Sequence, residues 1–204
     1  MKHAVMILLV RHGETPFNAA RIVQPADTPL SERGLAQAVR VAARIAGMGA
    51  SHVLASDLER ARKTAQIIAE ATGAPLELSE LLQERNFGEL RGRPYSELSE
   101  DAFWPEYTPP GGENGADVDA RARSAFALIV QKLASLEGNL VIVSHGLFCA
   151  ALMRAHVRLS DGMAMPDHFA NASLTVIERA APYRAQLLND VAHLAELHAE
   201  SGAV

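Results

Sequence analysis

The sequence predicts an α/β fold, a three-layer α/β/α sandwich with a mostly parallel central sheet and a small inserted lid region. Two short apolar runs, residues 4–10 and 140–143, are unbroken, as in central strands that helices cover on both faces. Segments with the apolar spacing of amphipathic helices alternate with strand-like segments along the chain. This alternation is typical of a parallel sheet with helices on both sides.

Local signals place the elements in order. The predicted strands cover residues 4–10, 53–55, 75–78, 140–143, 173–177 and 185–188. The predicted helices cover residues 31–47, 56–73, 117–138 and 147–155. The side chains expected to cap the starts of the first three helices are Ser31, Ser56 or Asp57, and Asp117. The glycines expected to end these helices are Gly47, Gly73 and Gly138. The alanine-rich tail from residue 191 is expected to fray.

Helical and strand periodicity fades between about residues 81 and 114. Prolines and glycines interrupt this stretch, and it contains the single tryptophan, Trp104. We expect it to form a lid over the edge of the sheet, where it would set substrate preference. A surface loop without a functional role is the alternative. Residues 1–204 are thus predicted to form a single domain with a lid insertion at about 81–114.

Composition narrows the functional class. The chain has 204 residues and a formal net charge of -5, which argues against binding of nucleic acid through phosphate neutralisation but permits a local basic pocket. Cys149 is the only cysteine, so no internal disulfide forms, and a buried inert thiol in a reducing compartment is expected. No apolar run approaches the ~20 residues that span a bilayer. We expect a cytoplasmic protein with no membrane partner, either a monomer or a homodimer.

Polar residues follow directly after both apolar strands. Arg11, His12 and Gly13 follow the first run, and His145 and Gly146 come after Ser144 at the end of the second. Ligands of open α/β sheets bind beyond the carboxyl ends of such strands. The two histidines can therefore meet at one edge of one sheet.

The polar residues expected at this edge form a set suited to an oxyanion. They are Arg11, His12, Asn18, Arg60, Glu84 and His145. Arginine forks bind tetrahedral oxyanions through bidentate, charge-assisted hydrogen bonds, and Arg60 lies in the first turn of a predicted helix, at the positive end of its dipole. A phosphate monoester, with about -1.5 to -2 charges near neutrality, is the matching ligand.

Four motifs in this order resemble the histidine phosphatase superfamily, which contains cofactor-dependent phosphoglycerate mutases and their phosphatase relatives. The motifs are Arg11-His12-Gly13-Glu14-Thr15, Ser56-Asp57-Leu58-Glu59-Arg60-Ala61, Glu84-Arg85-Asn86-Phe87-Gly88 and Ser144-His145-Gly146. The tract Pro109-Pro110-Gly111-Gly112-Glu113 is similar to a segment of the phosphatase branch. The resemblance extends from about residue 5 to residue 190.

The resemblance implies roles for individual residues. His12 corresponds to the nucleophile that becomes a phosphohistidine, and Glu84 corresponds to the proposed general acid. The positions implied to bind the phosphoryl group or substrate are Arg11, Asn18, Gln24, Arg60, His145 and Gly146. Pro25 departs from the pattern, because a glycine commonly follows the glutamine at position 24. The resemblance therefore does not imply the shape of that loop or the substrate contacts near it.

The residues alone support the same chemistry. A neutral imidazole at His12 can attack phosphorus, while His145, preferably as an imidazolium, meets the charge on the equatorial oxygens. Glu84 can protonate the leaving alkoxide only in its protonated form, which a neighbouring phosphate dianion favours; a structural salt bridge is the alternative role for Glu84. No metal-ligand spacing occurs, so we expect neither a metal nor a cofactor.

Three functions fit these observations. The leading one is a phosphomonoesterase acting on a small phosphorylated metabolite. A phosphoglycerate-type mutase would use the same residues, although such mutases typically carry a longer insertion between the acid and the second histidine. A non-catalytic phosphoester-binding module is the third. The lid residues that are candidates to contact the substrate are Arg91, Arg93, Tyr95, Trp104 and Tyr107, with a solvated side chain as the alternative for Arg91 or Arg93.

Overall fold

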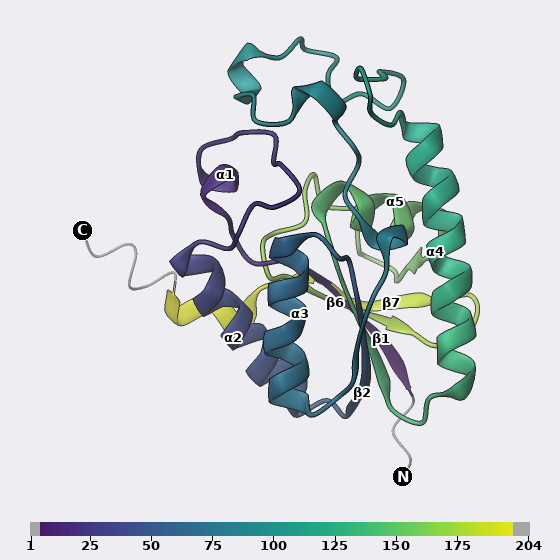
Figure 1. Ribbon diagram of the computed structural model, residues 1–204. Coiled ribbons are helices and arrows are strands. Elements are labelled where there is room, and N and C mark those ends of the chain that lie inside the picture. Colours follow the sequence, from purple (N-terminus) through teal and green to yellow (C-terminus); the bar gives the residue numbers. More distant parts are fainter. Residues whose placement is uncertain (1–4, 198–204) are drawn as a thin grey trace.

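The computed structural model describes residues 5–197, and within them seven strands form one sheet (Figure 1). The strands are β1 (Met6–Arg11), β2 (Ala50–Ala55), β3 (Leu76–Leu78), β4 (Asn139–Ser144), β5 (Arg158–Leu159), β6 (Leu174–Glu178) and β7 (Arg184–Asp190). Their spatial order is β3-β2-β4-β1-β6-β7-β5. The four strands β3, β2, β4 and β1 are parallel neighbours, whereas β6 pairs antiparallel with both β1 and β7. The predicted α/β class and mostly parallel sheet are confirmed.

Helices cover both faces of the sheet (Figure 1). The α-helices are α1 (Pro16–Ala19), α2 (Glu32–Ala46), α3 (Glu59–Thr72), α4 (Gly115–Ser135) and α5 (Gly146–His156). Alternate residues of β1 enter different cores: Ile7 and Leu9 pack with α4 and α5, while Leu8 and Val10 pack with α2 and α3. A strand buried on both faces must be apolar throughout, which explains the unbroken runs in the sequence.

The central strands β1 and β4 determine the position of the site. They run parallel, with Arg11 opposite Ser144, and the backbone N–H of His12 donates to the carbonyl of Ser144 at 3.0 Å. The residues that follow the two strands, His12 and His145, therefore leave the sheet side by side. This is the edge that the sequence predicts.

Two predicted helix starts are wrong. Helix α3 begins at Glu59 with Leu58 as its N-cap and no side-chain cap, so neither Ser56 nor Asp57 caps it. Helix α4 begins earlier than predicted, at Gly115, because Asn114 accepts from the N–H of Asp117 while the Asp117 carboxylate accepts from the N–H of Asn114. Such a reciprocal capping pair places the cap three residues before the residue that was predicted.

The ends of the elements also differ from prediction in places. Helix α4 ends at Ser135 with Leu136 as C-cap, short of Gly138, whereas Gly47 and Gly73 end α2 and α3 as expected. The tail does not fray at residue 191: the 3-10 turn Ala192–Leu194 packs against α2, with Leu194 buried. Ala4, the predicted start of the first strand, and the last part of the predicted tail, 198–204, lie outside the described residues.

The segment 81–114, called the lid below, lies above the carboxyl edge of the sheet (Figure 1). It contains the 3-10 turns Gly88–Leu90 and Tyr95–Glu97 and encloses a small apolar cluster with Val23. Backbone hydrogen bonds join it to the loop after α1: Tyr95 N–H donates to the carbonyl of Arg21 at 2.9 Å, and Gly92 N–H donates to that of Val23 at 2.7 Å.

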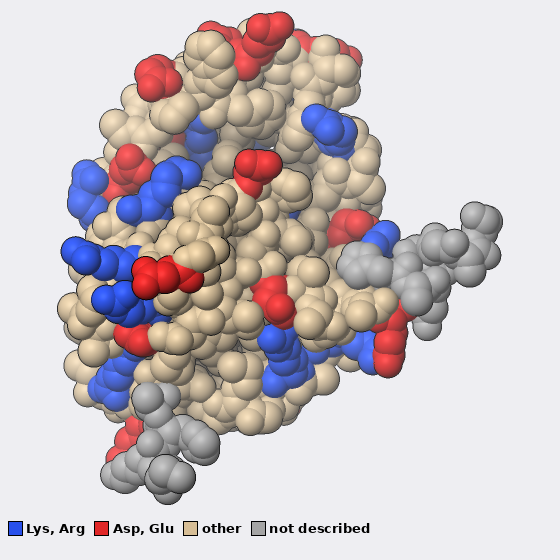
Figure 2. All heavy atoms as spheres, turned by 180° about the vertical axis from the view of Figure 1, so that it is seen from behind, with Lys and Arg blue, Asp and Glu red and all other residues tan. Residues whose placement is uncertain are grey.

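Charge is distributed unevenly over the surface. Figure 2, the view from behind, shows acidic side chains gathered at the top of the molecule, the part that the lid occupies in Figure 1. Among residues 5–197, none of the helices combines the length and the apolar character that crossing a bilayer requires. The single cysteine lies in the core. Cys149 is buried and forms no disulfide, and burial raises the pKa of its thiol, so it is an unreactive core residue.

Candidate active site

Two imidazole rings lie together at the carboxyl edge of the sheet. The ring centroids of His12 and His145 are 5.1 Å apart, with an angle of 58° between the ring planes. Both residues are almost fully buried. The sequence predicts this juxtaposition from the two strands alone, and the structure brings the two histidines together as expected.

Close backbone packing fixes the turn that carries His12. A side chain at Gly13 would collide with the carbonyl oxygen of Gly34 in α2, and one at Gly34 would collide with the backbone of Glu14. The N–H of Gly13 donates to the hydroxyl of Thr64 in α3 at 3.1 Å. Glycine at position 13 is therefore required by the approach of α2.

One hydrogen bond determines which nitrogen of His12 is free. Its Nδ1 lies 2.7 Å from the carbonyl oxygen of Gly13. A carbonyl oxygen only accepts, so Nδ1 carries the hydrogen and Nε2 keeps its lone pair. Burial first, and then the charges of Arg60 and Arg11, hold the pKa of His12 well below its usual value. His12 is thus a neutral imidazole whose Nε2 keeps a lone pair.

The environment of His145 differs from the prediction. Burial first, and then Arg60, hold the pKa of His145 well below its usual value, with smaller contributions from His12, Arg11 and Arg121. Desolvation and the neighbouring cations thus disfavour the second proton that the predicted imidazolium requires. The Nε2 of His145 lies 2.8 Å from the hydroxyl of Ser56, a contact that sequence reasoning missed.

Two arginines flank the pair of rings. Arg11 donates through Nη1 to the carbonyl of Phe169, and Arg60 donates through Nη1 to the carbonyl of Pro25 at 3.1 Å. The Nε groups of both arginines are buried with no hydrogen-bond partner in the described part of the chain. Burial lowers the pKa of Arg60 to about 10, so its guanidinium stays charged at neutral pH. Both side chains can therefore donate to an anion.

Amide side chains beside His12 have fixed orientations. The Oδ1 of Asn18 accepts from the N–H of Thr15 and from the Nδ2 of Asn171, and the Oε1 of Gln24 accepts from the Thr15 hydroxyl at 2.9 Å. The NH₂ groups of Asn18 and Gln24 are thus left to donate to a ligand. Asn171 also donates to the carbonyl of His12 at 3.1 Å and was not identified from the sequence.

Glu84 caps the helix that follows His145. Its carboxylate accepts from the backbone N–H groups of Arg85, Leu147 and Phe148 at 2.9–3.1 Å. Within residues 5–197 Glu84 forms no ion pair, and its hydrogen-bond donors are backbone groups of Arg85 and of the start of α5, so the predicted alternative of a salt bridge does not hold. This position places the carboxylate beside the pocket, in contact with the positive end of a helix.

An ion pair between Arg121 and Glu113 holds the segment that carries Glu84. Arg121 of α4 forms an ion pair with Glu113 at 2.8 Å and donates to the carbonyl of Gln83 at 2.6 Å. The Arg121 guanidinium also lies over the ring of Phe148, 4.8 Å from the centroid. Neither residue lines the pocket. The glutamate of the Pro109-Pro110-Gly111-Gly112-Glu113 tract therefore has a structural function here.

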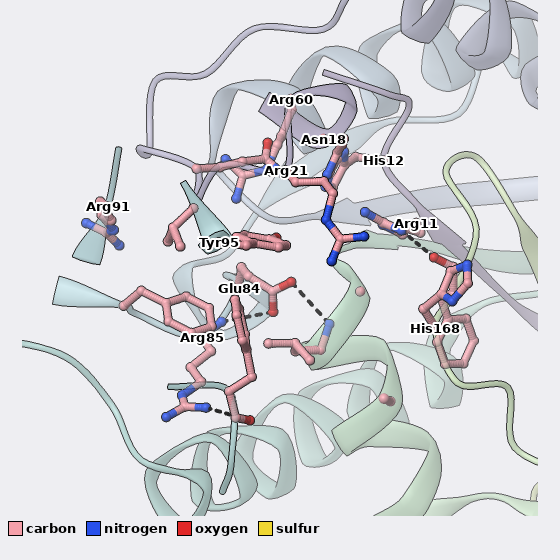
Figure 3. Close-up of a pocket in the computed structure, with 18 of the residues that line it drawn as sticks. Arg11, His12, Asn18, Arg21, Arg60, Glu84, Arg85, Arg91, Tyr95 and His168 are labelled. Atoms are coloured by element: carbon pink, nitrogen blue, oxygen red, sulfur yellow. Dashed lines mark hydrogen bonds between the residues drawn. The ribbon is translucent and has the colours of Figure 1, made fainter. Parts of the chain in front are cut away.

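These groups open into one pocket of about 630 Å³ (Figure 3). The predicted residues that line it are Arg11, His12, Asn18, Gln24, Arg60, Glu84 and Gly146. His145 lies behind this surface, within reach of His12. Such a concave site, with a few converging polar groups, is typical of small-molecule binding.

Only part of the lid prediction is correct. Arg91 and Tyr95 line the pocket, whereas Arg93, Trp104 and Tyr107 do not. Trp104 is 60 % exposed, so it faces solvent. Residues of the lining that the sequence did not indicate include Arg21, Phe87, Leu98, Phe103, Arg154 and His168. Their positions depend on loop packing and on the far end of α5, which leave no local sequence signal.

The pocket contrasts in charge with the whole chain. It is lined by six arginines and by the three acidic residues Glu84, Glu100 and Asp167, while the chain carries a formal net charge of -5. A phosphorylated ligand matches this local excess of positive charge. Within residues 5–197, no cluster of three or more histidine, cysteine or acidic side chains is arranged to hold a metal ion.

Comparisons with known proteins agree with this geometry. The probable phosphoglycerate mutase GpmB of Erwinia tasmaniensis is 34% identical over 204 residues, covering 93% of this chain and 95% of the relative. A mycobacterial glucosyl-3-phosphoglycerate phosphatase, solved as a complex with VO3, superposes with a TM-score of 0.78 and 30% identity over 92% of this chain and 100% of that one.

A further solved structure, YhfR of Bacillus stearothermophilus, superposes with a TM-score of 0.81 and 28% identity, covering 94% of this chain and 100% of that one. The family model described as the histidine phosphatase superfamily (branch 1) matches residues 7–190. This range contains all four motifs and every site residue described above. The chain belongs to the histidine phosphatase superfamily.

Proposed function

We propose that the protein is a phosphomonoesterase that hydrolyses a small phosphorylated metabolite through a phosphohistidine at His12. The observation that carries this proposal is the buried imidazole pair, 5.1 Å apart, in which His12 keeps Nε2 free between two arginines. A nucleophile needs such a lone pair, and a transferred phosphoryl group needs fixed donors around it.

The first step would form a bond between His12 Nε2 and phosphorus while the bond from phosphorus to the ester oxygen breaks. Arg11, Arg60 and the Asn18 amide would donate to the equatorial oxygens. The leaving alkoxide would take a proton from Glu84, which must first acquire it next to the bound dianion.

The second step would use the same carboxylate in reverse. Glu84, now ionised, would accept a proton from a water molecule as that water attacks the phosphohistidine, and the bond between nitrogen and phosphorus would break to release inorganic phosphate. Every charge in this scheme is supplied by side chains, so we expect turnover to persist in EDTA. A chelator-dependent loss, reversed by a divalent ion, would contradict that expectation.

Substrate choice would depend on the lid. We assign the lid, residues 81–114, as an insertion within a single domain. Arg91 and Tyr95 of the lid and Arg21 below it line the pocket on that side. A cytoplasmic monomer or homodimer remains the prediction from the sequence.

A mutase is the second candidate, because the Erwinia relative bears the name of a probable phosphoglycerate mutase. The two reactions share the first step and differ in the acceptor of the phosphoryl group, which is water or the hydroxyl of a phosphoglycerate.

Two assays on the purified protein distinguish these functions. Release of inorganic phosphate is measured across a panel of phosphorylated metabolites and an aryl phosphate, and interconversion of the two monophosphoglycerates is measured separately, with bisphosphoglycerate present. We expect phosphate release to exceed interconversion for at least one metabolite. Faster interconversion would favour the mutase, and binding of the esters without turnover would favour a non-catalytic module.

A further inference from the structure

The side chain of Ser56 contacts one of the two histidines of the site. Ser56 follows β2, is fully buried, and is held by its backbone N–H, which donates to the carbonyl of Val143 at 3.0 Å. Although the sequence suggests a helix cap, α3 begins three residues later, at Glu59. The Ser56 hydroxyl instead lies 2.8 Å from Nε2 of His145.

The hydrogen-bond partners of the Ser56 hydroxyl indicate which nitrogen of His145 carries a hydrogen. The Ser56 oxygen accepts from the N–H of Leu58 at 3.2 Å, so its own hydrogen remains to be donated. Among the described residues, His145 Nε2 is the one acceptor that lies within reach of it. If Nε2 accepts from the hydroxyl, the hydrogen of a neutral ring must be on Nδ1.

The surroundings of the ring disfavour the alternative of a doubly protonated imidazole. Arg60 on α3, Arg11 and His12 at the end of β1, and Arg121 on α4 all act against a second proton on His145. The Nδ1 atom is buried and has no hydrogen-bond partner within residues 5–197. It is therefore the free donor of a ring that lies beside the nucleophile.

We propose that Ser56 is a positioning residue that fixes His145 as the neutral tautomer with its hydrogen on Nδ1, so that this N–H donates to the phosphoryl group without a positive charge on the ring. This inference rests on the proposed function, in that the donor is useful only if a phosphoryl group binds between the rings. It assigns both histidines to neutral forms with complementary roles: His12 presents a lone pair and His145 presents a hydrogen.

The protein offers a matched control in Ser173. Ser173 is buried like Ser56, but its hydroxyl has no hydrogen-bond partner in the described part of the chain. Serine-to-alanine changes at both positions remove the same atom from the interior. Only the change at Ser56 removes a partner of His145.

The test reads the tautomer directly. The imidazole nitrogens of wild type, Ser56→Ala, Ser56→Thr and Ser173→Ala are labelled with ¹⁵N, and long-range ¹H–¹⁵N spectra are recorded near pH 7, with and without inorganic phosphate. The His145 signals are assigned with His145→Gln. In wild type we expect Nδ1 protonated and Nε2 unprotonated in both conditions, and the same pattern in Ser56→Thr and Ser173→Ala.

Ser56→Ala should lose the fixed tautomer and show averaged or reversed nitrogen shifts. The loss of one oriented donor should also lower turnover of the panel ester roughly tenfold, an effect of the size expected for one hydrogen bond, with recovery in Ser56→Thr. Protonation of Nε2 in wild type, alone or together with Nδ1, would overturn the inference. Identical spectra for Ser56→Ala and Ser173→Ala would also overturn it.

These outcomes are separate from the test of the proposed function. If the wild-type protein hydrolyses esters while His145 is doubly protonated, only the role of Ser56 is refuted, and the proposed function stands. A wild-type protein that hydrolyses none of the panel refutes the proposed function, whatever the tautomer.

Discussion

The floor and the lid of the pocket are built in different ways. The floor, defined as Arg11, His12, Arg60 and His145, is attached to strand ends and to the first turn of a helix, so the register of the sheet sets its geometry. The lid consists largely of loops and 3-10 turns that are joined to the rest by hydrogen bonds to backbone carbonyls. Changes in the floor should therefore alter chemistry, whereas changes in the lid should alter binding and stability.

The largest effect is expected at the nucleophile of the floor. His12→Ala removes the free Nε2 and should lower kcat/KM for every ester by at least about 10⁴-fold, because no other group between the arginines can form the intermediate. Steady-state phosphate release measures this. His52→Ala, at the start of β2 and outside the pocket, serves as the control and should keep activity within a few-fold. Substantial hydrolysis by His12→Ala would show that the floor does not supply the nucleophile.

Glu84 lies within the lid in the sequence, but its carboxylate is held at the start of α5, the helix that follows His145 of the floor. Glu84→Gln should lower kcat by roughly 10²–10³-fold for alkyl phosphates, whose leaving group needs a proton, and much less for an activated aryl phosphate. A plot of log kcat against leaving-group pKa should become steeper in the variant. An equal loss for both classes of ester would exclude the role of general acid.

A substitution at Arg85 tests whether the lid affects substrate binding. Its buried guanidinium donates to four lid carbonyls, those of Phe103, Trp104, Tyr107 and Glu113. Arg85→Met leaves these acceptors without the donor, so we expect the free energy of unfolding to fall by about 2 kcal/mol and KM to rise several-fold, with kcat for aryl phosphates little changed.

Arg93→Met is the matched control for this change, because the Arg93 side chain is exposed and, within residues 5–197, its guanidinium makes one hydrogen bond, to the carbonyl of Glu97. Urea unfolding and steady-state kinetics of both variants make the comparison. If Arg85→Met lowered kcat for the aryl phosphate as strongly as it raised KM, the separation between floor and lid would not hold.

A smaller effect is expected from pH. The folded-state pKa values of His12 and His145 lie below the ordinary value, so the unfolded chain binds more protons as the pH falls below about 6.5. Stability should therefore decrease below that pH, by up to about 1.4 kcal/mol per pH unit for each histidine. The pKa values of His156 and His193 are also lowered, so the informative quantity is the difference between wild type and His145→Gln.

Urea unfolding at pH 7.0, 6.0 and 5.5 measures this difference. The free energy of unfolding of His145→Gln should decline less steeply with falling pH than that of wild type. Parallel curves would mean that the interior does not depress the pKa of His145.

The same contrast explains what the sequence could predict. The floor was predictable because each of its residues adjoins a local pattern, an apolar strand end or a helix start, and parallel strands bring their carboxyl ends together. Ser56 and Asn171 act through contacts between segments distant in the sequence, His145 and His12 respectively, and no local pattern reveals such contacts. The sequence did not reveal how strongly burial and the arginines act against a second proton on His145, because burial could not be judged from it.

The lid was only partly predictable for a physical reason. Its proline and glycine content indicates an irregular segment, but the direction of each side chain depends on which carbonyls Arg85 holds and how the apolar cluster packs. Tyr95 points into the pocket and Trp104 does not, although both are aromatic residues of the same loop.

The most direct test is to find the site of the covalent intermediate. Wild-type protein is mixed with a ³²P-labelled ester for less than one turnover and quenched in alkali, which preserves phosphohistidine, and the labelled peptide is identified by mass spectrometry. The account predicts an acid-labile phosphoryl group on the His12 imidazole, absent from His12→Ala. A phosphoryl group on any other side chain, with His12 unmodified, would contradict it.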